Sequence, residues 1–316
     1  MDGSLKMIKN KAFIYLFCIF IIFNQKCVGL ENKILVKIEN EIISTVDVNN
    51  ESKYLITLNK SIQKLNQKEI FELSKKSIIR EKIKTIEIHK NFINPKIPDK
   101  FLEKILKNVY QKLEINDLNS FKEYLKTNNV DYEYVKDKIQ TEALWNELIV
   151  KMYSSKIKIN VDEIKQSIVE NNNKASKSYL LSEITFEISN TKELDSYLEE
   201  IKRVIKDKGF SNTALTYSTS STSSIGGQLD WIEEDSLNKN LKDILSKMKK
   251  NEITNPITVP GGFLILKIDD IKKIKKNKNI EQEIKKVVNI KRNIQLNQFS
   301  KMYFNKVKNN IQINEL

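Results

Sequence analysis

The sequence predicts an α+β protein that has a mostly helical part and one small part built around a sheet. Three observations lead to this fold class. Glycine and proline are scarce, with 7 and 4 residues among 316, which favours long helices. Apolar residues recur at helical spacing along the first half and again near the end. Between 178 and 272, strand-like and helix-like runs alternate around two glycine pairs.

Residues 1–29 have the features of a cleavable secretory signal. Lysines precede an uninterrupted apolar run from Ala12 to Phe23. Its 12 residues would span about 18 Å as a helix. That is short of the roughly 30 Å hydrocarbon core of a membrane. Small residues at Cys27 and Gly29 predict cleavage before Leu30. We therefore expect an exported, periplasmic protein with no stable membrane insertion once the signal is removed.

Two alternatives remain open for this segment, a transmembrane anchor and a lipoprotein modified at Cys27. The preceding Asn24-Gln25-Lys26 is a poor lipoprotein cleavage motif. Cleavage after Gly29 would remove Cys18 and Cys27, the only cysteines of the chain. The mature protein would then have no disulfide, and a chain without thiols suits an oxidising periplasm.

Residues 30–174 are predicted to form a helical domain that begins with a strand pair. The run from Ile34 to Ile43 indicates two strands around a turn near Asn40, and Asp47 is placed to cap the next helix. Apolar spacing predicts the following helices at 48–58, 69–89, 99–113, 118–127, 132–153 and 161–170. Their expected caps include Asn66, Asp117, Asp131 and Asn160.

A polar linker at 171–174 leads into residues 175–272, which we expect to form one small α+β domain with a four-stranded sheet. The expected strands lie at 179–186, 229–232, 256–259 and 263–268. The expected helices lie at 194–205, before Tyr217-Ser218 and at 237–248. A Ser/Thr-rich loop at 218–224 precedes Gly226-Gly227, and Pro260-Gly261-Gly262 predicts a tight turn.

Residues 277–316 are predicted to return to the N-terminal domain as a long helix and a short strand. A basic hinge at 272–278 precedes an apolar stripe from Ile280 to Val307, and the tail at 311–313 alternates like a strand. An amphipathic stripe needs a partner surface, and the small domain is already complete at Ile268. One domain is therefore expected to be built from both ends of the chain.

The charge balance and the scarcity of histidine exclude several classes of function. A net charge of +13 could suit a nucleic-acid binder. The lysines, however, alternate with glutamates along the predicted helices. We therefore infer a solvated basic surface and expect no nucleic-acid partner. An anionic membrane or acidic clients remain alternatives. His89 is the only histidine, which argues against a zinc site or a Ser-His-Asp triad. No metal and no cofactor are expected.

Several motifs in residues 178–272 resemble those of parvulin-type peptidyl-prolyl isomerases. They are Gly226-Gly227-x-Leu229-x-Trp231, Asn251-Glu252-Ile253-Thr254-x-Pro256 and Gly262-Phe263-x-Ile265. The flanking segments resemble the SurA family of periplasmic chaperones, chiefly over residues 31–60. The resemblance implies a SurA-like helical chaperone domain that is completed by the C-terminal helix and carries one parvulin-like domain.

In parvulins an apolar slot holds the proline ring of the substrate. By resemblance, Leu229, Leu237 and Leu241 form this slot here, and Phe263 belongs to the same substrate-binding set. The alternative reading is that the leucines are simply part of the domain core.

Parvulins also have a polar floor of two facing histidines with a cysteine or aspartate. The resemblance places Glu183 and Leu264 at the two histidine positions and Ser220 near the third. A glutamate and a leucine cannot reproduce a pair of imidazoles, so the catalytic residues, if any, are unknown.

The resemblance implies an exported chaperone that holds unfolded, outer-membrane-type clients through proline-containing or aromatic-rich segments. The alternative is an active peptidyl-prolyl cis-trans isomerase, and a third reading is a purely structural module. Isomerisation would need little acid–base chemistry, because the barrier of about 18–20 kcal/mol comes from amide resonance. A slot that favours the twisted amide over the planar one lowers that barrier.

Overall fold

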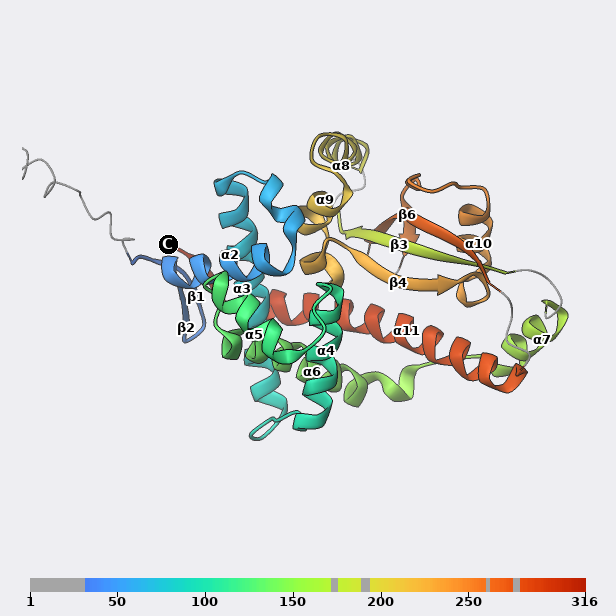
Figure 1. The fold of residues 1–316 in the computed structure, drawn as a ribbon, viewed down its shortest axis with the longest axis horizontal. Coiled ribbons are helices and arrows are strands. Elements are labelled where there is room, and N and C mark those ends of the chain that lie inside the picture. The colour runs from blue at the N-terminus through green and yellow to red at the C-terminus, as the bar shows by residue number, and fades with distance from the viewer. Residues whose placement is uncertain (1–31, 172–175, 189–193, 260–261, 275–278) are drawn as a thin grey trace, which may run out of the picture. The chain divides into compact units, whose positions relative to one another are not determined.

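The computed structural model describes residues 32–171, 176–188, 194–259, 262–274 and 279–316, and it confirms the α+β fold class (Figure 1). The expected signal, most of the linker at 171–174, the turn residues Pro260 and Gly261, and the end of the basic hinge lie outside these residues. Residues Ile34–Leu316 group into one unit. Within the described part of the chain, no helix is both long and apolar enough to cross a membrane.

A small antiparallel sheet joins the first and last described strands of the chain. Its order is β2 (Glu41–Ser44), β1 (Ile34–Ile38) and β7 (Ile313–Glu315). Ile38 pairs with Glu41 on one side and with Ile313 on the other. The final strand begins at Ile313 rather than at the expected residue 311, because buried Ile311 is still the C-terminal cap of the preceding helix.

Amphipathic helices follow the strand pair, and all but the last of them enclose the largest apolar core. They are α2 (Thr45–Leu58), α3 (Gln67–Asn91), α4 (Asp99–Lys112), α5 (Leu118–Thr127), α6 (Tyr132–Tyr153) and α7 (Val161–Asn171), with short 3₁₀ turns at Lys60–Lys64 and Ser154–Lys156. Asn66, Asp117 and Asp131 cap their helices as expected.

The prediction that Asp47 caps α2 is wrong, because Ser44 occupies that position. The Ser44 hydroxyl accepts from the Asp47 amide at 3.3 Å, and the Asp47 carboxylate accepts from the Ser44 amide at 2.7 Å. Asp47 is therefore the third helical residue of a capping box. The two reciprocal bonds satisfy amide groups that the start of a helix would otherwise leave unpaired.

A buried ion network holds α2, α3 and α6 together. The Lys138 ammonium on α6 lies 2.7 Å from the carboxylate of Glu51, which is fully buried on α2, and also contacts Glu81 on α3. The hydroxyls of Tyr134 and Ser77 both donate to Glu51 at 2.6 Å. Buried charges are tolerated when they are paired and hydrogen-bonded in this way. The network therefore ties three helices to one relative arrangement.

The second sheet has the order β4-β3-β6-β5 and lies between two helical layers. Residues 176–274, here called the sheet module, contain β3 (Ser176–Phe186), α8 (Leu194–Lys208), α9 (Phe210–Tyr217), β4 (Gln228–Glu233), α10 (Lys239–Ser246), β5 (Ile257–Val259) and β6 (Gly262–Ile274). Apolar side chains of α8 and α9 pack on one face of the sheet, and those of α10 pack on the other.

Several boundaries in the sheet module differ from the sequence prediction by a few residues, among them the end of β6 and the start of α10. Strand β6 continues to Ile274 rather than ending at 268, because its extension stays paired with β3, with Ile271 opposite Tyr179. Helix α10 begins at Lys239 rather than at 237. The Asn238 side chain caps that helix by accepting from the Leu241 amide, which leaves Leu237 in an extended conformation.

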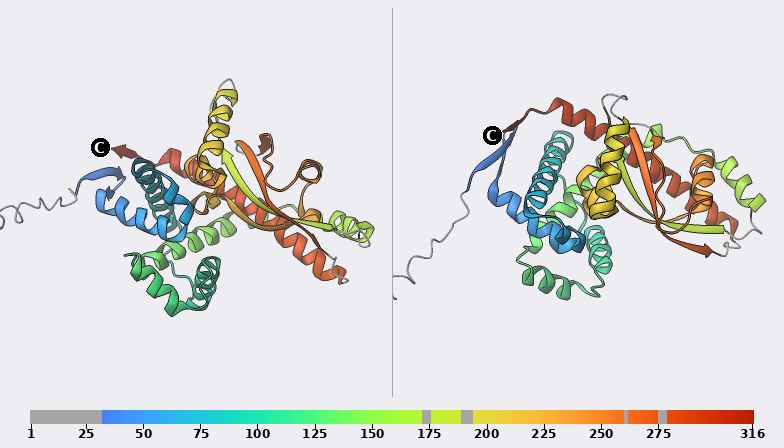
Figure 2. Two further views of the ribbon diagram at one scale, coloured as in Figure 1. Left: turned by 45° about the horizontal axis from the view of Figure 1, so that its top comes forward. Right: turned by 90° about the horizontal axis from the view of Figure 1, so that it is seen from above.

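The long helix α11 (Ile280–Asn310) packs on α3 and α6 of the helical core and on α7. Near its end, Phe299 stacks on Tyr153 and Tyr303 stacks on Trp145, with ring centroids 4.8 and 5.7 Å apart. Near its start it packs against α7, where Val287 meets Ile164 and Ile168. In Figure 2, α11 runs from the first sheet past α6 toward α7.

The buried ring of Tyr303 provides a test of this docking. Replacing Tyr303, which is 7% exposed, by alanine should lower the free energy of unfolding by about 3–5 kcal/mol, the usual cost of removing a buried aromatic ring. Urea unfolding followed by circular dichroism measures the change. Its neighbour Met302 is 52% exposed, so Met302→Ala should stay within about 0.5 kcal/mol of wild type. Equal effects of the two changes would contradict the packing described here.

Candidate functional site

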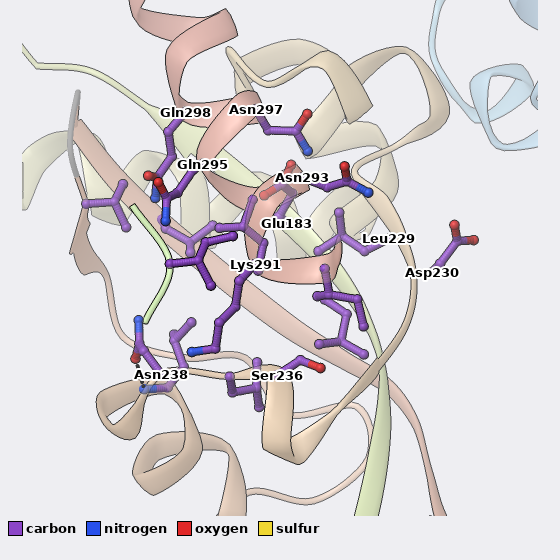
Figure 3. A pocket seen from close by; sticks show the side chains of 18 of the residues that line it. Glu183, Leu229, Asp230, Ser236, Asn238, Lys291, Asn293, Gln295, Asn297 and Gln298 are labelled. Carbon is purple, nitrogen blue, oxygen red and sulfur yellow. Dashed lines mark hydrogen bonds between the residues drawn. The ribbon is translucent and has the colours of Figure 1, made fainter. Parts of the chain in front are cut away.

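A cavity of about 720 Å³ lies between the sheet module and α11. Strands β3, β4 and β6 and the segment around α10 supply one wall, and α11 supplies the other. A third side is formed by the segment that enters α7. Figure 3 shows side chains from these elements around the hollow. The described part of the chain contains no group of three or more His, Cys, Asp or Glu side chains that could hold a metal ion.

The apolar side of the cavity contains the three leucines that were expected to form a slot. Leu229 and Leu241 of this set are partly buried at the edge of the apolar cluster under α10, as is Leu264 from the expected polar floor, and each also lines the cavity. Leu237 lines it too, but at 8% exposure it is mainly a core residue. The leucines thus border both the core and an open space large enough for a peptide side chain.

The structure places Phe263 on the other face of the sheet. Phe263 pairs with Phe186 across β3 and β6, and their rings stack with centroids 5.6 Å apart. Both belong to the apolar cluster under α8 and α9. Side chains alternate between the two faces of a strand, so Leu264 points to the cavity while Phe263 points away from it.

A chain of hydroxyl groups connects Glu183 to the Ser/Thr-rich loop. The Thr222 hydroxyl donates to the Glu183 carboxylate at 2.8 Å and lies 2.6 Å from the Ser220 hydroxyl. The Ser220 hydroxyl in turn lies 3.1 Å from that of Ser218, which accepts from the Thr185 amide. Glu183, Thr185 and Ser220 all line the cavity. The three residues expected at the polar floor, Glu183, Leu264 and Ser220, therefore share one surface.

Two contacts with neighbouring residues fix the position of these hydroxyl groups. Gly227 has a φ of +78°, and a Cβ there would lie 2.1 Å from the Glu183 carbonyl oxygen. Only glycine permits this close approach, which lets the Glu183 amide donate to the Gly227 carbonyl at 2.8 Å. From α3, the Arg80 guanidinium donates to the Ser223 hydroxyl and the Ser220 carbonyl. The Ser/Thr-rich loop is thus tied to both β3 and α3.

The charges of the cavity are held in an environment that opposes ionisation. Burial raises the pKa of Glu183 above its ordinary value, against the hydrogen bonds from Thr222 and Ser220 and the attraction of Lys301. Burial also lowers the pKa of Lys301, against the attraction of Glu187 and Glu183. The Lys301 ammonium is buried and has no hydrogen-bond partner among the described residues. An acidic and a basic group therefore line one partly desolvated space.

The wall formed by α11 was missed by the sequence analysis. Asn293, Asn297 and Lys301 line the cavity from this helix, whereas the sequence pattern pointed only to its apolar stripe. On the same helix, the Gln295 amide is bonded to the Lys158 backbone at both its oxygen and its nitrogen. The polar positions do recur at helical spacing, but the sequence alone does not show which module they face.

Comparisons with known proteins agree with the resemblance seen in the sequence. A family model described as rotamase, the PPIC-type PPIase domain, matches residues 183–270. Chaperone SurA of Pseudomonas putida is 23% identical over 184 residues, which are 55% of this chain and 43% of that protein. Foldase protein PrsA of Bacillus subtilis is 26% identical over 196 residues, 58% of this chain and 64% of that one. The chain thus spans less than two thirds of the length of these relatives.

Solved structures include similar chains. One of two SurA-like chaperones of Campylobacter jejuni is 19% identical, covers 90% of this chain and 99% of its own, and gives a TM-score of 0.35. Bacillus subtilis PrsA is 17% identical, with coverages of 88% and 92% and a TM-score of 0.29.

The raised pKa of Glu183 predicts how stability depends on pH. A carboxyl whose folded-state pKa is raised contributes stability that is present at low pH and is lost as the pH rises through that pKa. Glu183→Gln keeps an oxygen that can accept the hydrogen bond from Thr222, and it removes the loss of stability that ionisation causes. Its melting temperature should therefore exceed that of wild type at pH 7.5 and approach it below about pH 4, where the carboxyl is protonated in both states.

Differential scanning fluorimetry across this pH range checks the prediction. Exposed Glu147 on α6 provides the matched control, and Glu147→Gln should shift the melting temperature little at any pH. A Glu183→Gln protein that is less stable than wild type at pH 7.5 would show that the buried carboxylate is stabilising instead.

Proposed function

We propose that this SurA-like chain, which carries a parvulin-type peptidyl-prolyl isomerase domain at residues 183–270, is a chaperone that holds unfolded polypeptides at the cavity between the sheet module and α11. The observation that carries the proposal is the arrangement of this cavity. A partly exposed leucine slot lies beside a hydrogen-bonding surface, and both face an open space of peptide dimensions. Peptide-binding grooves combine apolar pockets with main-chain hydrogen bonding in this manner.

The residues of the polar floor favour holding over fast catalysis. We infer by resemblance that Glu183 and Leu264 replace the two histidines of parvulins, and His89, the only histidine, lies outside the module on α3. Glu183 is hydrogen-bonded to Thr222, while Leu264 offers no polar group. The surface can therefore bind an apolar side chain without presenting a pair of imidazoles to the prolyl amide.

The proposed setting of this activity is the periplasm. It follows from the signal-like residues 1–29 and from the likeness to SurA. The proposed organisation has a chaperone domain at 30–174, a parvulin-like domain at 175–272, and residues 277–316 completing the first domain. The pairing of β1 with β7 and the packing of α11 on α6 support this division. The proposed clients are unfolded, outer-membrane-type polypeptides, recognised at proline-containing or aromatic-rich segments.

The leucine slot provides a test of client holding. The Leu241→Ala variant should protect a urea-unfolded outer-membrane porin from aggregation less well than wild type. Its affinity for the unfolded porin should fall by about tenfold or more, since fully burying a leucine contributes roughly 1.5–3 kcal/mol. Light scattering and fluorescence titration measure both effects. The control is Ile253→Ala, which removes a 39% exposed side chain of the same module that does not line the cavity. If both variants protect the porin as well as wild type does, the slot is only core.

An active isomerase is the second candidate, and the hydroxyl chain that ends on Glu183 is the observation that favours it. Wild-type turnover of a proline peptide should be well below that of two-histidine parvulins. Glu183→His with Leu264→His should raise it by about tenfold or more, because one oriented donor at a reacting group is worth roughly 10²–10³ in rate in other enzymes. A protease-coupled assay measures the rate. Fast wild-type turnover that survives Glu183→Ala would disprove the importance of the floor.

A further inference from the structure

The α11 wall of the cavity carries a row of polar side chains that the proposed slot does not use. Asn293, Asn297 and Lys301 follow one another at intervals of four residues, and all three line the cavity. Figure 3 shows the amide groups of Asn293 and Asn297 next to each other on this helix. Neither amide makes a hydrogen bond within the described residues. Three side chains whose polar groups make no hydrogen bond within the described residues thus line the same space.

Lys301 supplies a second, independent sign that this wall takes a ligand. Its ammonium group is buried and has no hydrogen-bond partner in the described part of the chain. An ammonium group carries three donors, and leaving them unpaired away from water destabilises the free protein. Lys301 also lines the cavity, so a change of its side-chain rotamer would bring the ammonium to an acceptor placed in that space. A peptide carbonyl is such an acceptor.

The spacing of the row matches the repeat of an extended polypeptide. Residues four apart on a helix are separated by about 6 Å along its axis. In an extended chain, every second residue presents its N–H and C=O to the same edge, with a repeat of about 6.6–6.8 Å. From Asn293 to Lys301, which is two such steps, the helix and the extended chain get out of register by only about 1.5 Å. Flexible side chains can absorb this difference. An asparagine amide can both donate to a carbonyl and accept from an N–H.

We propose that Asn293, Asn297 and Lys301 form a main-chain reader that binds one edge of an extended client segment while the leucine slot holds one of its side chains. This inference rests on the proposed function and adds its substrate class. The ligand is an extended backbone with free N–H groups, largely independent of sequence. The sheet module supplies the selection of one apolar side chain, and α11 supplies hydrogen bonds that every polypeptide can accept.

Selective N-methylation of a peptide tests the reader, because it removes N–H donors from one edge and leaves all side chains in place. The probe is a fluorescein-labelled 11-residue peptide of threonine and leucine with a central Leu-Pro. Two further versions are methylated at alternate residues, one on each edge. Full-length wild type should bind one methylated version about tenfold more weakly than the parent, as expected for two lost hydrogen bonds. The other version should bind nearly as well as the parent.

Asn293→Ala with Asn297→Ala should bind the parent peptide about tenfold more weakly than wild type. It should also lose the discrimination between the two methylated versions. The matched control is Asn289→Ala with Asn309→Ala, two exposed positions of α11 that do not line the cavity, which should behave as wild type. Lys301→Met should weaken binding of the parent severalfold and raise the melting temperature of the free protein.

The outcomes separate this inference from the proposed function. If wild type binds no version of the peptide, the proposed function fails and the reader fails with it. If wild type binds the parent and Leu241→Ala weakens binding, but the asparagine variant retains full affinity and the same response to methylation, the reader alone is disproved. A lower melting temperature for Lys301→Met would show that the buried ammonium stabilises the fold and is not reserved for a ligand.

Discussion

The aromatic contact between α6 and α11 is the constraint on which the candidate site depends. Trp145 and Tyr153 receive Tyr303 and Phe299 in two stacked pairs, and the Trp145 indole donates to Ser300 at 2.9 Å. Because these rings fix the rotation of α11 about its axis, they also fix which side chains of that helix face the sheet module. A helix that docked with another face would present a different wall to the leucine slot.

The polar side of the cavity contains ionisable groups whose burial is unfavourable and which neighbouring contacts hold in place. Glu183 is placed in surroundings that raise its pKa, and the Lys301 ammonium is buried without a hydrogen bond in the described residues. Such groups destabilise a fold unless other contacts hold them, and strain of this kind tends to gather at functional sites. Gly227 and Arg80 supply the restraint here, one through a close backbone approach and the other through two hydrogen bonds to the Ser/Thr-rich loop.

Local patterns predicted most of the elements, but the site needed contacts between distant segments. Period-2 and period-3.6 patterns located the strands and helices, and Asn66 and Asp131 marked true helix starts. Ser44 and Asp47 show the limit, because both residue types suit a cap and only the geometry of the turn decides between them. Phe263 was grouped with the slot by resemblance, yet strand alternation places it under α8 and α9. Asn293 and Asn297 gave no signal, since an exposed asparagine on a helix looks the same whether it faces solvent or a binding site.

The pairing of β1 with β7 has a consequence for how the protein is made. The two strands come from opposite ends of the described chain, with Ile38 beside Ile313, and the whole sheet module is inserted between them. Contacts this distant in sequence form late, because the intervening chain must be synthesised and its loop entropy overcome. During synthesis, the sheet module can fold while the helical layers still lack α11 and their third strand. Until α11 is added, the apolar core of these layers stays exposed and the cavity lacks one of its walls.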